Sequence, residues 1–81
     1  MNTRPTIYSR HVRRRMRLYH ISPLQVTEVV TTPEALGPSI KGRMNATKTV
    51  EGRRIRVTYL EEDREYAIIT VTPLDPPKEE P

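Results

Sequence analysis

The chain has 81 residues, with 14 lysines and arginines, 10 aspartates and glutamates, 8 prolines and no cysteine. This length predicts one domain with a small core and little room for a deep cleft or a bound dinucleotide. The absence of cysteine excludes a disulfide scaffold, a thiolate metal site and a cysteine nucleophile. Since no apolar run could span a membrane and no apolar stretch follows the arginine-rich start, we expect a cytoplasmic protein without membrane contact.

The charge is divided unevenly along the chain. Thirteen basic against seven acidic residues leave residues 1–74 at +6, whereas one lysine against three acids leaves residues 75–81 at −2. Composition therefore predicts a flexible N-terminus at residues 1–6, a single α+β domain at residues 7–74 and a disordered, acidic, proline-rich tail at residues 75–81. The basic excess favours a polyanionic partner. The alternative is a solvated helix face that the acidic residues 61–63 balance.

The first predicted helix carries most of the arginines. Ser9 is a plausible N-cap for a helix over residues 10–19, whose apolar side chains (Val12, Met16 and Tyr19) share one face. The opposite face carries a stripe of four arginines: Arg10, Arg13, Arg14 and Arg17. Like charges three and four residues apart destabilise a helix, so the stripe indicates an anionic partner or an intramolecular acidic cluster.

His11 and Arg15 border the apolar face of the same helix. They are four residues apart and therefore neighbours on the helix surface, where a partly exposed side chain can be held and still reach a ligand. We consider them candidate catalytic residues. The alternative is structural, with His11 at the start of the helix and the stem of Arg15 covering the edge of the core.

A second helix is predicted from strong terminal signals. Ser22 fits an N-cap, Pro23 fits the first helical position and Gln25 completes a capping box. Pro33 predicts the end of this helix. The following residues 34–42 contain two glycines and a proline, which predicts a loop.

Three strands are predicted at residues 43–50, 53–60 and 66–72, with a two-residue turn at Glu51 and Gly52. In this register one face is apolar, and the third strand adds Ala67, Ile69 and Val71 to it, with Ile68 exposed. The predicted fold is α+β, with two N-terminal helices packed on one face of a three-stranded antiparallel β-meander. The other face would be an open platform of threonines with Arg54 and Arg56, which could bind phosphates or simply face solvent.

Several short motifs resemble an uncharacterised family of small prokaryotic domains related to the RelE-like and BrnT-like toxins. The matching residues are Ser9, His11, Arg15, Met16, Ile21-Ser22, Pro33, Gly52-Arg53-Arg54, Val57 and Thr70-Val71. The resemblance implies helices on one side of an antiparallel sheet, an open sheet face that binds RNA and in some relatives cuts it, and a small acidic antitoxin-like partner protein.

Three functions follow as hypotheses. In an endoribonuclease, His11 would be the acid or base, while Arg15, Arg54 and Arg56 would stabilise phosphate charge. In a non-catalytic nucleic-acid-binding module, the arginines of the first helix and of the sheet would contact the backbone of the nucleic acid. In a protein-interaction domain, a sheet edge or the arginine stripe would bind a partner. The sequence predicts no metal and no cofactor.

Overall fold

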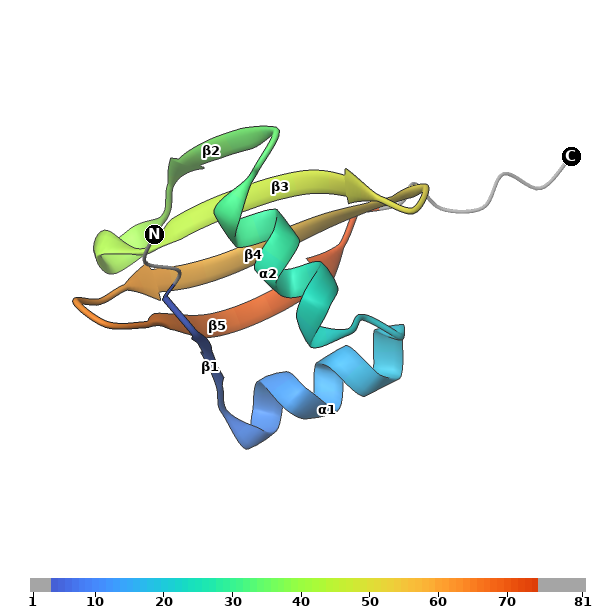
Figure 1. Ribbon diagram of the computed structural model, residues 1–81, viewed down its shortest axis with the longest axis horizontal. Helices are drawn as coiled ribbons and strands as arrows, with labels where there is room; N and C mark the ends of the chain where they lie inside the picture. The colour runs from blue at the N-terminus through green and yellow to red at the C-terminus, as the bar shows by residue number, and fades with distance from the viewer. Residues whose placement is uncertain (1–3, 75–81) are drawn as a thin grey trace, which may run out of the picture.

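Two helices lie on one face of a five-stranded mixed sheet in the computed structural model, which describes residues 4–74 (Figure 1). The fold is therefore α+β. In chain order the elements are β1 (Thr6–Tyr8), α1 (Arg10–Tyr19), α2 (Pro23–Thr31), β2 (Ala35–Pro38), a 3-10 turn η1 (Ile40–Gly42), β3 (Met44–Val50), β4 (Arg53–Glu61) and β5 (Tyr66–Pro73).

Both helices begin at the predicted caps. The Ser9 hydroxyl accepts a hydrogen bond from the Val12 amide at 3.2 Å and starts α1. At α2, the Ser22 hydroxyl accepts from the Gln25 amide at 3.2 Å, and the Gln25 side chain accepts from the Ser22 amide at 3.0 Å. The capping box is thus confirmed, with Pro23 in the first turn as predicted.

The β3–β4 hairpin has the predicted register. Val50 pairs with Arg53, and Ala46 pairs with Val57. Glu51 and Gly52 between them have φ values of 52° and 81°. Positive φ at both turn residues is the requirement of a type I′ turn, which matches the twist of the two strands.

The sheet is larger than the expected three-stranded antiparallel meander. Its strand order is β1-β5-β4-β3-β2, with β1 parallel to β5 and the other neighbours antiparallel. The segment at residues 34–42, expected to be a loop, contains β2. Residues 4–6, assigned to a flexible terminus, contribute to β1 and its contacts, since the Pro5 carbonyl accepts from the Tyr66 amide at 2.9 Å. Residues 1–3 and the predicted tail at 75–81 lie outside the described residues.

The prediction for the apolar face of β5 is wrong at Ile68. Ile68 is 3% exposed and pairs with Tyr59, whereas Ile69 is only half-buried. The pairing shifts by one residue between Thr58 and Tyr59, because Thr58 pairs with Thr70. This β-bulge interrupts the two-residue alternation and turns both Ile68 and Val71 toward the helices.

The helices and the sheet bury one shared core. Its helical members come from α1 and α2, and its sheet members come from the facing sides of β3, β4 and β5. They are Val12, Met16, Ile21, Val26, Val29, Val30, Ala46, Val50, Ile55, Val57, Tyr59, Ile68 and Val71. Arg53 ties the hairpin to the turn between the helices, since its guanidinium donates to the His20 carbonyl at 3.1 Å. Within residues 4–74, no helix covers the other face of the sheet.

Candidate nucleic-acid interface

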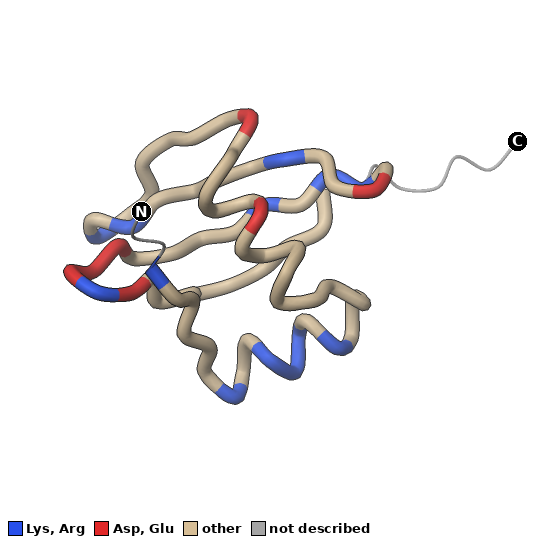
Figure 2. The backbone as a smooth tube through the Cα atoms, in the orientation of Figure 1, with Lys and Arg blue, Asp and Glu red and all other residues tan. Residues whose placement is uncertain are grey.

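Four arginines form one exposed surface on α1, here called the α1 arginine face: Arg10, Arg13, Arg14 and Arg17. Burial of Val12 and Met16 against the sheet fixes the rotation of the helix and directs these arginines outward. The basic residues of α1 follow one another along the helix, which runs below the sheet strands in the view of Figure 2. In the part of the chain that the structure describes, none of the four pairs with a carboxylate.

The acidic loop that could have balanced this face lies elsewhere. Glu61 forms an ion pair of 2.7 Å with Arg4, which also donates to the Asp63 carbonyl at 3.1 Å. The pKa of the Glu62 carboxyl is raised, first by its hydrogen bond with the Glu65 side chain and further by desolvation and by the negative charges of Glu65 and Asp63. Among the described residues, the acidic residues 61–63 therefore form no ion pair with the α1 arginine face, and the alternative of a solvated helix face stays open.

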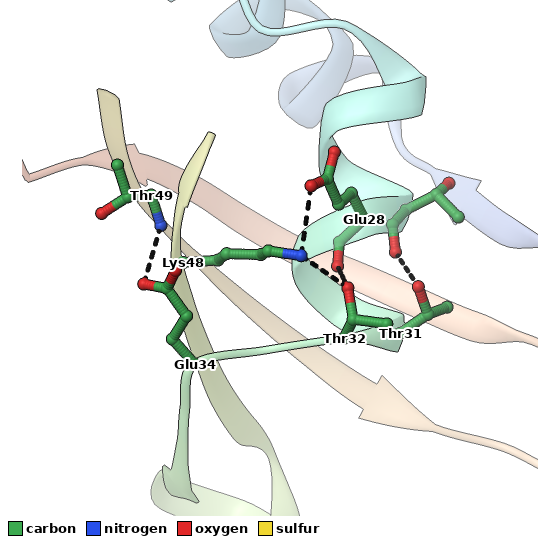
Figure 3. A network of polar contacts seen from close by, with 7 residues as sticks. Glu28, Thr31, Thr32, Glu34, Lys48 and Thr49 are labelled. Carbon is green, nitrogen blue, oxygen red and sulfur yellow. Dashed lines mark hydrogen bonds and ion pairs between the residues drawn. The ribbon is translucent and has the colours of Figure 1, made fainter. Parts of the chain in front are cut away.

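Two cations of the β3–β4 hairpin, Lys48 and Arg54, are paired with acidic side chains of neighbouring elements. Figure 3 shows the contacts of Lys48 and of Glu34. The Lys48 amine lies 3.1 Å from a Glu28 carboxylate oxygen and donates to the Thr32 hydroxyl at 2.7 Å. Glu34 accepts a hydrogen bond from the Thr49 amide at 3.1 Å and lies 3.5 Å from the Arg54 guanidinium. These contacts close the C-terminal end of α2 on β3 and neutralise part of the hairpin charge.

The open face of the sheet carries mainly threonine hydroxyl groups and few basic side chains. Arg56 on β4 is half-buried between its strand partners Thr47 and Thr72. In the next row, the buried Thr58 hydroxyl donates to the Asn45 side-chain oxygen at 2.6 Å. Of the two predicted phosphate-binding arginines of this face, Arg54 is engaged by Glu34 and Thr49.

All four tyrosines lie away from this open face. Tyr8, Tyr59 and Tyr66 belong to the helix-covered side by their strand pairing, and Tyr19 is on α1. Proteins that read single-stranded RNA on a sheet stack bases on exposed aromatic rings. The described part of the open face has no exposed aromatic ring, so it could contact only the sugar-phosphate backbone of an RNA.

The predicted catalytic residues, His11 and Arg15, do not share a site with the predicted phosphate-binding arginines of the sheet. His11 is exposed on α1, and Arg15 one turn later is half-buried with its guanidinium carbon 5.2 Å from the centre of the Tyr19 ring. Arg15 Nε is buried and has no hydrogen-bond partner within residues 4–74. Arg54 and Arg56 belong to the other side of the sheet. The structure therefore brings His11 and Arg15 together and leaves both apart from the two sheet arginines.

A pocket of about 330 Å³ lies on one flank of the α1 arginine face. Its lining residues come from β1, from α1 and from the start of α2: Tyr8, Arg13, Met16, Arg17, Ile21 and Pro23. This pocket was not predicted from the sequence, because strand β1, which carries Tyr8, was not predicted. The run Thr6-Ile7-Tyr8, rich in β-branched and aromatic residues directly before the Ser9 cap, is the signal that could have indicated it.

No family model, curated protein or solved structure matches this chain. The resemblance to RelE-like and BrnT-like domains therefore stays a prediction. In the described part of the chain, no group of three or more histidine, aspartate or glutamate side chains could hold a metal ion. The helices found among these residues are too short and too polar to cross a membrane.

Proposed function

We propose that this protein binds RNA through the sugar-phosphate backbone, with the α1 arginine face as its contact surface. The observation that carries the proposal is the set of four exposed arginines on one helix face without an acidic partner among residues 4–74, while Arg4, Lys48 and Arg54 are each paired with a carboxylate. Guanidinium groups bind phosphate oxygens in bidentate geometry and keep their charge at any physiological pH. Such contacts give affinity without base specificity.

The helix carries an electrostatic cost that an anionic ligand would relieve. Arg10 lies three residues from Arg13 and four from Arg14, and Arg17 lies four from Arg13 and three from Arg14. Like-charged pairs at these spacings each destabilise a helix by a few tenths of a kcal/mol. The first turn of α1 holds no acidic residue that would offset the charge. Phosphates bound along this face would remove the repulsion.

Binding is supported better than cleavage. Cleavage of RNA by the candidate residues requires a proton-transfer group within hydrogen-bond reach of a phosphate that the arginines hold. His11 is exposed on α1, whereas Arg54 and Arg56 lie across the sheet from it. His11 therefore cannot act on one phosphate together with the two sheet arginines, and the proposal assigns phosphate contact to the helix alone.

The test compares two double variants with equal loss of charge. Arg10→Gln with Arg14→Gln removes half of the α1 arginine face, and Arg54→Gln with Arg56→Gln removes the two arginines of the open sheet face. We expect the helix pair to weaken binding of a labelled single-stranded RNA at low salt by ~10-fold or more, because each charged phosphate contact contributes about 1 kcal/mol or more. The sheet pair should change affinity less than threefold.

The same titrations can overturn the proposal. Equal losses of RNA affinity in the two double variants would show that α1 is not the main contact surface. A larger loss of RNA affinity in the sheet pair would place the contact surface on the open face of the sheet. RNA fragments formed by the wild type and absent with His11→Ala would show catalysis in place of simple binding. Thermal unfolding followed by circular dichroism establishes that each variant is folded.

A second candidate function is binding of a small acidic partner protein at the β2 edge of the sheet. Leu36 on β2 is 54% exposed and Ile40 on η1 is 67% exposed. Exposed apolar side chains beside an edge strand favour addition of a partner strand. Absence of RNA binding at low salt by the wild-type protein would favour this candidate over the first.

A further inference from the structure

The pocket beside the α1 arginine face combines charge with an apolar floor. Arg13 and Arg17, one helical turn apart, form its charged side, and the buried side chains of Met16 and Ile21 lie beneath. Arg10 and Arg14 belong to the same face and do not line the pocket. The α1 arginine face therefore has two halves of equal charge, of which one adjoins a pocket.

The aromatic wall of the pocket is held in place. Tyr8 pairs with Ile68 in the sheet, and its ring packs against the core. Its hydroxyl shares a hydrogen bond of 2.6 Å with the Thr6 hydroxyl on the same strand. Pro23, rigid in the first turn of α2, contributes a second inflexible surface. Preformed walls reduce the entropy that a ligand loses on binding.

We infer that this pocket takes one unstacked base of a single-stranded RNA, with the flanking phosphates on Arg13 and Arg17. This inference rests on the proposed function and deepens it from backbone contact to single-strand recognition. A volume of about 330 Å³ is at the small end of ligand pockets and suits one planar ring system. A base has apolar faces for Tyr8, Met16 and Pro23, and it always comes with phosphates beside it. A base stacked in a duplex cannot enter, so the pocket selects single strands.

The test separates base binding from phosphate binding with two probes. A single-stranded RNA carries both groups, whereas inorganic polyphosphate carries the charge without bases. We expect Tyr8→Leu to weaken RNA binding about fivefold or more and to leave polyphosphate binding unchanged, because contact between a base and an aromatic ring contributes affinity of this size. Tyr8→Phe keeps the ring and should retain wild-type affinity for RNA.

Exposed arginines supply a second comparison that does not disturb the core. Arg13→Gln with Arg17→Gln and Arg10→Gln with Arg14→Gln remove the same charge from the same helix. We expect the first pair to lose several-fold more affinity for single-stranded RNA than the second, and both pairs to lose equally on polyphosphate. Wild-type protein should also prefer the single strand to a duplex of the same sequence.

Three results would overturn the inference. The first is equal losses for RNA and polyphosphate in every variant, which would leave the backbone contact of the proposed function intact without a base in the pocket. The second is failure of the wild type to bind either polyanion, which would remove the proposed function as well. The third is a Tyr8→Leu loss seen with a synthetic glutamate–leucine peptide and not with RNA, which would assign the pocket to a side chain of an acidic protein.

Discussion

Single arginines in this protein differ in their surroundings more than in their chemistry. Arg4 lies 2.7 Å from Glu61, and Arg54 lies 3.5 Å from Glu34. Arg13 and Arg17 instead line a pocket and have no acidic partner among residues 4–74. A guanidinium that is already paired must give up that contact before it binds phosphate, whereas an unpaired one exchanges only water. The count of arginines in the sequence could not show this difference.

The pKa of Tyr59 gives a prediction about the core. Burial raises the pKa of its phenol above the usual value near 10, and the charges of Glu61 and Tyr66 add to the rise. The folded protein thus favours the neutral phenol. The stabilisation from this group is complete below the unfolded pKa and is lost as the pH rises through the folded pKa.

Absorbance titration of the tyrosines measures this shift. Wild-type protein should show an ionisation step displaced to alkaline pH, and Tyr59→Phe should lack it. The variant should also keep its stability to higher pH, because phenylalanine cannot ionise. A displaced step that survives in Tyr59→Phe would show that the buried phenol is a different one.

At the scale of elements, the short-range signals predicted more than the long-range ones. Ser22 and Gln25 define the start of α2 within four residues, and the turn at Glu51 and Gly52 fixes the hairpin register by itself. Strand β1 was missed because three residues form it only by pairing with β5 some sixty positions later. Strand β2 was missed because Gly37 and Pro38 resemble a turn.

The candidate site was likewise predictable from local sequence patterns only in part. Helical spacing alone placed the α1 arginine face, since three- and four-residue periods are local. The pocket needs Tyr8 from one element beside Pro23 from another, and no local pattern contains that contact. The bulge that buries Ile68 was likewise invisible, because the apolar run of β5 fits either alternation.

The arginines of helix α1 are expected to lower the stability of the folded protein while raising its affinity for RNA. Arg10 is the first residue of the helix, where the helix dipole disfavours a positive charge and like-charged neighbours add repulsion. Arg10→Glu should therefore stabilise the protein by about 0.5–1 kcal/mol, a rise in Tm of roughly 2–8 °C for a chain of this size. RNA affinity should fall in the same variant.

Thermal denaturation of the Arg10→Glu variant measures the expected rise in stability, and RNA titration of the same sample measures the expected fall in affinity. Arg10→Gln, which removes the charge without adding a negative one, should give a smaller rise in Tm. A fall in Tm for Arg10→Glu would mean that the arginine makes a stabilising contact within the protein, and the helix would then carry no cost for an anion to relieve.

At the scale of the molecule, the surface regions differ in whether their basic side chains are already in ion pairs or are free to bind a polyanion. The acidic loop at residues 61–65 and its partner Arg4 lie at one end of the sheet, and Lys48 and Arg54 with their acidic partners lie elsewhere, on the β3–β4 hairpin (Figure 2). The α1 arginine face remains as the concentrated, unpaired positive surface of the described chain. The net charge of +4 therefore understates the local charge that a polyanion would meet.

The salt dependence of RNA binding shows directly whether α1 holds the phosphates. Each phosphate that an arginine neutralises on a single strand contributes about −0.7 to the slope of log K against log salt concentration. Replacement of all four arginines of the α1 arginine face by glutamine should therefore make the slope less negative by about 2 to 3. The double variant of Arg54 and Arg56 should keep the wild-type slope. An unchanged slope in the four-arginine variant, with RNA still bound, would show that α1 does not hold the phosphates.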